Sequence, residues 1–223
     1  LSRHVSQGNT RRGAWAGYVP IEHGDFWEIA DHLVNHPDDC NVGWLISEQF
    51  IKDLDSGCSD ALSRYQRALK VKMVTGKGYF IFVDRMNAQN PPMYAEHGLK
   101  VRASNLCTEI TLHSDEFHTF TCVLSSMNLN KYDEWKDTDA VQTAIMFLDC
   151  VAEEFIKLGR GIKGLERAVR STEYGRALGL GTLGFHTYLQ QNMIPIESME
   201  AYQLNQKIFS GIKAEAKEAS RKL

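Results

Sequence analysis

The sequence contains no C-x-x-C pair, and its five cysteines are odd in number and irregularly spaced. This pattern excludes the disulfide framework of a small secreted protein, and no spacing fits a zinc ribbon. The cysteines, most of which we expect to be reduced thiols, are Cys40, Cys58, Cys107, Cys122 and Cys150. Their role is therefore expected to lie in thiol chemistry or in packing rather than in crosslinking.

Long apolar runs and an excess of basic residues are also absent. No run approaches the roughly 20 residues that span a bilayer, and residues 1–13 lack the apolar core of a signal peptide. The sequence therefore predicts a cytoplasmic protein that has no membrane partner. The net charge of −3 offers no basic stripe for phosphate contacts, so we expect no nucleic-acid partner.

What is present describes a folded chain, because 223 residues with 43% apolar and 24% charged content can bury a substantial core. Apolar and β-branched runs predict strands at residues 14–19, 41–46, 78–84 and 121–129. Helical periodicity and capping residues predict helices at residues 24–36, 47–54, 60–74, 138–157, 165–172 and 196–222. This alternation predicts an α/β sheet or barrel. Because no composition shift marks a linker, residues 1–223 are predicted to form a single domain or part of one.

The segment SNLCTEI, residues 104–110, places polar or reactive groups at alternate positions. In an extended strand Asn105, Cys107 and Glu109 would share one face. A nearby carboxylate and burial both disfavour a charged thiolate, so the pattern indicates a neutral thiol suited to exchanging a hydrogen atom. Glu109 would take a proton from a substrate hydroxyl, and Asn105 would hydrogen-bond a second hydroxyl. The alternative is a buried structural cysteine beside two solvated polar residues.

Cys122 belongs to the next apolar run, TCVLSSMNL at residues 121–129. A hairpin-like return of the chain would bring Cys122 near Cys107, where a second thiol would serve reducing chemistry. A core cysteine is the alternative, because the run is apolar on both sides of Cys122.

The loop SQGNTRRGA, residues 6–14, combines glycine with side chains that recognise a base or a phosphate. It lacks the Gly-Lys-Ser/Thr of a phosphate-binding P-loop, and a solvated basic turn is the alternative interpretation.

No metal site is predicted from the sequence. The pairs His32 with His36 and His113 with His118 each lack a convincingly spaced third ligand. The glycines of GLGTLG, residues 179–184, are interpreted as positions of close strand packing rather than as a dinucleotide fingerprint.

SNLCTEI followed by TCVLSSMNL resembles the catalytic large subunit of ribonucleotide reductase, particularly the aerobic class I enzymes. SQGNTRRGA is similar to the family's specificity loop, and TGKGYFIFVDRMN is similar to one of its strand segments. GRALGLGTLGFHTYL with the ensuing IPIESMEAYQLNQKIF resembles its carboxy-proximal barrel region. The resemblance covers most of the chain. It implies an α/β fold that is part of the family's ten-stranded α/β barrel, with a finger loop that carries the radical cysteine.

Residue by residue, the resemblance implies that Cys107 is the transient thiyl radical that removes the 3′-hydrogen of the substrate. Glu109 would be the base at the 3′-hydroxyl, and Asn105 a hydrogen-bonding partner in that site. Cys122 would be one member of the redox pair that supplies reducing equivalents to the 2′-carbon. The implied substrate-contacting positions are Ser104, Asn105, Leu106, Cys107, Thr108 and Glu109.

The resemblance also implies partners. Residues of the specificity loop would lie between the substrate base and a nucleotide effector, ATP or a deoxynucleoside triphosphate; these residues are Gln7, Gly8, Asn9, Arg11 and Arg12. No cofactor would bind the chain directly, because a metal-containing small subunit supplies the radical. The other implied partners are the remaining part of the large subunit and a reductant, thioredoxin or glutaredoxin. The chain alone is expected to be inactive.

Two alternatives stay open. The cobalamin-dependent class shares the barrel and the radical cysteine but generates its radical from adenosylcobalamin. The resemblance favours class I, because the cobalamin enzymes more often carry proline before the cysteine, where this chain has Leu106. A non-catalytic barrel remnant that only docks with a partner polypeptide is the other alternative.

Overall fold

The structure, a computed structural model, describes residues 6, 7 and 10–223, and it describes residues 6, 7, 11 and 12 by their backbone alone. The chain forms two compact units, Leu1–Asp115 and Glu116–Leu223. Among the described residues, no helix is both long enough and apolar enough to cross a membrane.

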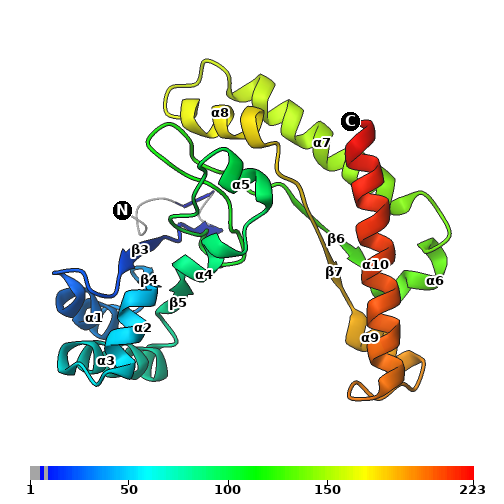
Figure 1. Ribbon diagram of the computed structural model, residues 1–223. Coiled ribbons are helices and arrows are strands. Elements are labelled where there is room, and N and C mark those ends of the chain that lie inside the picture. Colours follow the sequence, from blue (N-terminus) through cyan, green and yellow to red (C-terminus); the bar gives the residue numbers. More distant parts are fainter. Residues whose placement is uncertain (1–5, 8–9) are drawn as a thin grey trace. The chain divides into compact units, whose positions relative to one another are not determined.

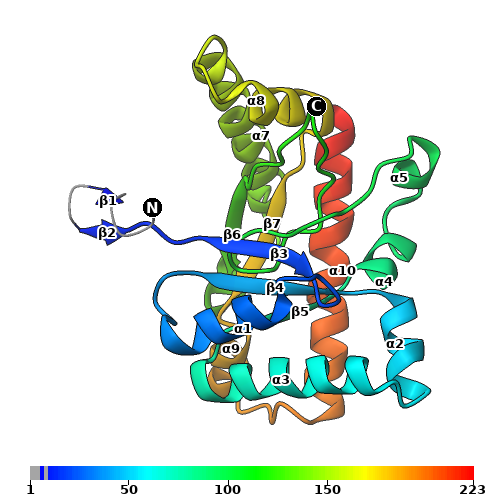
Figure 2. The same ribbon diagram turned by 90° about the vertical axis from the view of Figure 1, so that its left-hand side faces the viewer.

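A three-stranded parallel sheet lies at the centre of the first unit (Figure 2). Its strands, in spatial order, are β3 (Ala16–Pro20), β4 (Asn41–Ile46) and β5 (Tyr79–Phe82). The connections run through α1 (Phe26–Asn35), α2 (Glu48–Asp55) and α3 (Ser59–Thr75). Parallel strands need crossover connections of this kind. The predicted alternation of strands and helices is confirmed here.

One face of this sheet packs against helices. Val42, Trp44 and Ile46 alternate along β4 and are buried in one core with residues of α1 and α3. Trp44 is fully buried, and its ring centroid lies 4.8 Å from that of Phe26 on α1. The buried residues of α1 recur at the predicted helical spacing; they are Phe26, Ala30 and Leu33. Burial of apolar surface therefore holds this half of the unit together.

On the opposite face of the sheet, three residues on neighbouring strands are paired side by side. Tyr18 on β3 and Tyr79 on β5 both pair with Gly43 on β4. A Cβ atom at Gly43 would lie 2.3 Å from Cε1 of the Tyr18 ring, so only glycine leaves room for the ring there. The tyrosine ring consequently lies directly over the middle strand.

The chain beyond the sheet differs from its prediction. The predicted strand at residues 78–84 ends at Phe82, because α4 (Val83–Ala88) begins at the next residue. A further short helix, α5 (Pro92–Glu96), follows with proline in its first turn, where proline is favoured. Residues 97–115 lie outside helices and strands.

The second unit contains two parallel strands, β6 (Leu124–Asn128) and β7 (Gly179–Leu183). Its helices are the 3-10 helix η1 (Leu129–Lys131), α6 (Tyr132–Trp135), α7 (Ala140–Gly159), α8 (Glu166–Gly175), α9 (Phe185–Gln191) and α10 (Met199–Lys222). Helices α7 and α10 pack on each other (Figure 1). The predicted helices at 138–157, 165–172 and 196–222 are confirmed as α7, α8 and α10. A Cβ at Gly179 would lie 2.4 Å from Leu124 Cδ2, which confirms that this glycine permits close strand packing.

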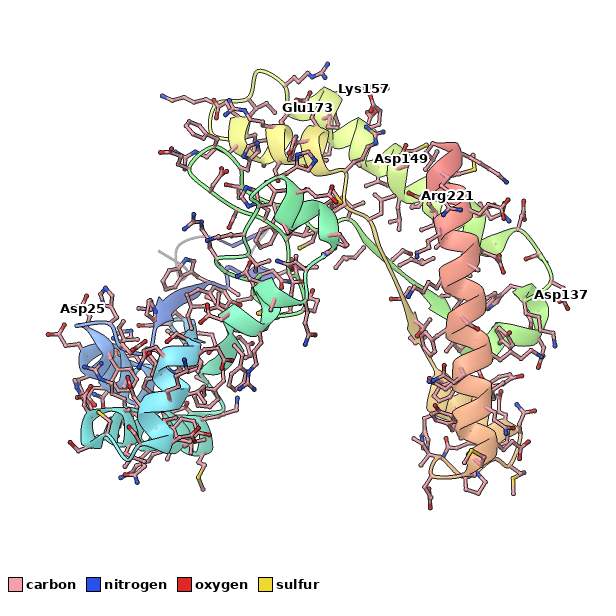
Figure 3. The ribbon with its side chains drawn as sticks, in the orientation of Figure 1. Asp25, Asp137, Asp149, Lys157, Glu173 and Arg221 are labelled. Atoms are coloured by element: carbon pink, nitrogen blue, oxygen red, sulfur yellow. The ribbon has the colours of Figure 1, made fainter. Side chains whose placement is uncertain are left out.

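Arg176 ties the start of the β7 segment to α7. Its Nε and Nη2 donate to the two carboxylate oxygens of Asp149 at 2.6 and 3.0 Å, and Nη1 donates to Glu153 at 2.9 Å. These bonds from Arg176 hold the pKa of Asp149, which Figure 3 labels on α7, below its ordinary value. Arg176 has a positive φ of 40° where α8 ends. The bidentate ion pair stabilises this sparsely populated conformation.

Candidate active site

The cysteine-bearing segment is a turn rather than a strand. Thr108 N donates to Asn105 O at 3.1 Å, and Thr108 has a positive φ of 72°. Leu106 and Cys107 lie at the apex of this turn. The expected sharing of one strand face by Asn105, Cys107 and Glu109 is therefore wrong. The physical reason is the positive φ of Thr108, which reverses the chain where a strand would continue.

Two polar side chains close the turn below the cysteine. Asn105 Oδ1 accepts hydrogen bonds from Ile110 N at 3.1 Å and from Ser104 Oγ at 3.2 Å. Ser104 Oγ also lies 2.7 Å from Ile110 O, within hydrogen-bond distance. Ser104 is only 7% exposed. Within this structure Ser104 and Asn105 therefore shape the backbone around the cysteine, in addition to any contact with a substrate.

A second set of contacts closes the wider loop of residues 100–113. His113 Nδ1 lies 3.0 Å from Lys100 N and 2.9 Å from Lys100 O. The Asn87 side chain of α4 accepts from Val101 N and donates to Val101 O, both at 2.9 Å. The loop is thus fixed at its base to a helix of the same unit.

Tyr18 reaches the turn from the sheet. Its hydroxyl donates to Asn105 O at 2.5 Å and lies 3.4 Å from Thr108 Oγ1. The turn therefore contacts the sheet through Tyr18, on the face opposite Trp44. Sequence reasoning did not identify Tyr18, because a contact across 87 residues leaves no signal in a local pattern.

The thiol is more exposed than expected. Cys107 and Glu109 are both exposed, and Leu106 beside them is 39% exposed. The expectation of a dry, sheltered sulfur is therefore wrong for this chain by itself. A turn apex projects from its own backbone, and the described residues of this unit provide no cover over it.

Cys122 belongs to the second unit and lies two residues before β6, where the predicted strand would have included it. Thr121 Oγ1 lies 2.8 Å from Thr172 Oγ1 on α8, and Val123 is buried against α7. Both neighbours of Cys122 are thus fixed while Cys122 itself is exposed. The predicted proximity of Cys122 to Cys107, which belongs to the other unit, stays a prediction.

Other candidate positions are only partly described. Gly8 and Asn9 lie outside the described residues, whereas the backbone of residues 6–7 pairs antiparallel with that of residues 11–12, so Gln7 faces Arg11 in the register. The assignment of these residues, together with Arg12, to a specificity loop stays a prediction.

Two of the histidines considered as metal ligands, His32 and His113, lie near carboxylates. The rings of His32 and His36 lie 5.0 Å apart, and His32 Nε2 is 3.7 Å from a carboxylate oxygen of Asp39. His113 Nε2 lies 2.9 Å from Asp115 Oδ2. The interpretation that the chain holds no metal stays a prediction.

Comparison with known proteins shows the family of this chain. The family model described as "Ribonucleotide reductase, barrel domain" matches residues 59–223. A relative in Frog virus 3 (isolate Goorha), named "Putative ribonucleoside-diphosphate reductase large subunit", is 35% identical over 97% of this chain and 42% of its own length. The solved structure of "Actinobacillus ureae class Id ribonucleotide reductase alpha subunit" matches with a TM-score of 0.88 and 39% identity, over 96% of this chain and 42% of that one. A "Vitamin B12-dependent ribonucleoside-diphosphate reductase" from Thermoplasma acidophilum is 27% identical over 98% of this chain and 30% of its own length.

The chain spans less than half the length of these relatives. The matches confirm the predicted α/β fold class and its place in the reductase barrel. The family match runs across both units, whereas the finger loop and the single-domain arrangement stay predictions. This chain belongs to the ribonucleotide reductase family and carries part of the family's barrel domain.

Proposed function

We propose that this chain supplies the radical cysteine of a ribonucleoside-diphosphate reductase large subunit, which reduces ribonucleotides to deoxyribonucleotides for DNA synthesis. The observation that carries the proposal is the turn at residues 104–110. It holds an exposed thiol at its apex, with a carboxylate at Glu109 and an amide at Asn105 in the same short segment. Membership of the reductase family supports this assignment.

In the proposed reaction, the Cys107 sulfur radical takes the 3′-hydrogen atom, so that an S–H bond forms as the C3′–H bond breaks. Glu109 accepts the proton of the 3′-hydroxyl, and the 2′-hydroxyl leaves as water. Cys122 and a second cysteine of the large subunit then supply two electrons and two protons and become a disulfide, and the Cys107 thiol returns its hydrogen atom to C3′, which restores the sulfur radical. In balance, a ribonucleotide and a dithiol give a deoxyribonucleotide, a disulfide and water. Thioredoxin or glutaredoxin restores the dithiol, which suits a cytoplasmic enzyme.

A sulfur radical needs protection from solvent that the described residues do not provide. The relatives are more than twice as long as this chain. We therefore assign the cover over Cys107 to the remaining part of the large subunit, which would close the barrel around a finger-like loop. In that complete barrel the two units would belong to one domain.

The relatives described as large or class Id alpha subunits support a radical that comes from a separate, metal-containing small subunit. The loop with Gln7, Gly8, Asn9, Arg11 and Arg12 would lie between an ATP or deoxynucleotide effector and the substrate base. These residues would then decide which ribonucleotide enters the site.

The test uses the complete large subunit that contains this chain, mixed with its radical-generating subunit and a dithiol reductant. Cys107→Ala is expected to abolish product formation. Cys58→Ala is the matched control, because Cys58 is another exposed cysteine of the same unit and is expected to leave turnover unchanged. Unchanged product formation by Cys107→Ala would instead support a barrel that only docks with a partner.

The similarity to the B12-dependent reductase keeps the cobalamin-dependent reaction as a second candidate. Assays with the small subunit alone and with adenosylcobalamin alone separate the two. We expect turnover to follow the small subunit. Turnover that follows adenosylcobalamin would reassign the radical source while leaving the role of Cys107 in place.

A further inference from the structure

We propose that Tyr18 is a positioning residue for the radical cysteine, because its hydroxyl ties the Cys107 turn to the parallel sheet. The inference rests on the proposed role of Cys107 and adds a residue that lies outside the cysteine motif. The Tyr18 hydroxyl donates to Asn105 O at 2.5 Å, across 87 residues of sequence.

The carbonyl that Tyr18 contacts is the one that defines the turn. Asn105 O also accepts the hydrogen bond from Thr108 N, at 3.1 Å, that closes the turn around Cys107. The Tyr18 hydroxyl lies 3.4 Å from Thr108 Oγ1 as well. One hydroxyl therefore contacts the residues on both sides of the two-residue apex, and movement of the apex relative to the sheet would break its bond.

The position of the Tyr18 ring is itself fixed by the sheet. Tyr18 pairs in register with Gly43 on the middle strand, and the ring occupies the space that a side chain at that position would fill. The strand beneath the ring is anchored by Trp44, which is fully buried on the other face. The hydroxyl thus projects from a rigid base, as a residue that holds a reactive group must.

The backbone of the turn needs such support. Thr108 is β-branched and has a φ of 72°, a conformation that L-residues with branched side chains rarely adopt. Such a conformation persists when the surrounding contacts over-determine it. Without the Tyr18 bond, the Asn105–Thr108 turn would relax more easily and Cys107 would change its direction.

Hydrogen-atom transfer makes this position important, because a displacement of about 1 Å can cost on the order of 100-fold in rate. A hydroxyl bond at a half-buried position adds comparatively little to folding. A positioning role therefore predicts a variant that folds normally but transfers hydrogen slowly. A purely structural role predicts a variant that is less stable but transfers hydrogen at the normal rate.

The experiment compares Tyr18→Phe with Tyr79→Phe in the complete large subunit with its radical-generating subunit. Tyr79 is the matched control, because it is a tyrosine that pairs with the same residue, Gly43, from the other neighbouring strand, β5. The ring of Tyr79 lies near Lys72, whose Nζ is 5.9 Å from the ring centroid. We expect Tyr18→Phe to lower kcat by roughly 10- to 100-fold with KM little changed. We also expect it to enlarge the isotope effect on kcat/KM for 3′-deuterated substrate, since hydrogen transfer becomes more rate-limiting.

Cys107→Ala in the same assay separates two kinds of failure. Turnover by Cys107→Ala overturns the proposed function. Absent turnover by Cys107→Ala, together with equal kcat and isotope effect for Tyr18→Phe and Tyr79→Phe, overturns the role of Tyr18 alone. Failure of Tyr18→Phe to fold, measured by urea denaturation beside Tyr79→Phe, also overturns it, because the proposal assigns the hydroxyl to turn position rather than to stability.

Discussion

The parallel sheet and the loop of residues 100–113 belong to the same unit but are held by different forces. The sheet buries a continuous apolar core, with Trp44 fully buried against Phe26. The loop has no helix or strand, and its shape depends on hydrogen bonds such as those that the side chains of Asn87 and Asn105 accept from Val101 N and Ile110 N. Because of this difference, we expect that folding stability and the geometry of the candidate site can be changed separately. A sheet substitution should unfold the unit, whereas a loop substitution should move the cysteine.

The largest effect on stability is expected in the sheet. Trp44→Ala removes a fully buried ring and should destabilise the protein by about 3–5 kcal/mol, because it loses apolar burial and leaves a cavity. Urea denaturation followed by circular dichroism measures this loss. Trp15→Ala, at a 60% exposed tryptophan of the same unit, is the control and should change stability little. Equal losses at the two positions would mean that burial against the helices does not hold the sheet.

A smaller effect on stability is expected in the loop. Asn105→Ala removes the acceptor for Ile110 N, so we expect a loss of about 1 kcal/mol. Hydrogen exchange of the Ile110 amide should become faster at the same time. Asn105→Asp keeps an acceptor at this position and should preserve most of the protection. Equal exchange rates in the parent and in Asn105→Ala would show that the side chain does not close the turn.

The smallest expected difference concerns thiol reactivity rather than stability. Cys40, just before β4, is half-buried, and its pKa is raised mainly by burial and also by the charge of Asp39. Its reactive thiolate therefore forms at a higher pH than in an ordinary cysteine. Alkylation followed by mass spectrometry should modify Cys107 and Cys58 before Cys40. Modification of Cys40 at the rate of Cys58 would contradict the burial described for Cys40, just before the middle strand of the sheet.

Local patterns predicted the sheet region well, because its residues repeat with the periods of strands and helices. The strand predicted at residues 41–46 matches β4. Ser47, the first residue of the helix predicted at 47–54, caps α2 by accepting a hydrogen bond from Phe50 N at 3.0 Å. Each of these features depends on neighbours in sequence, so it is visible before folding. The same holds for the apolar spacing of α1.

The geometry of the candidate site was not predictable in this way. The residue types of the motif were identified from sequence, but alternate polar residues suggested a strand where Thr108 turns the chain. Threonine at positive φ is maintained by distant contacts, such as that of Tyr18, and not by local preference. The ion pair of Arg176 with Asp149 was missed for the same reason.

The central claim is that the Cys107 sulfur takes a hydrogen atom from the substrate. The most direct measurement is the turnover of 3′-deuterated and unlabelled ribonucleotide by the complete large subunit with its radical source, for the parent protein and for Cys107→Ala. We predict slower turnover of the deuterated substrate by the parent and no turnover of either substrate by Cys107→Ala. Product formation by Cys107→Ala with the isotope effect of the parent would contradict the claim.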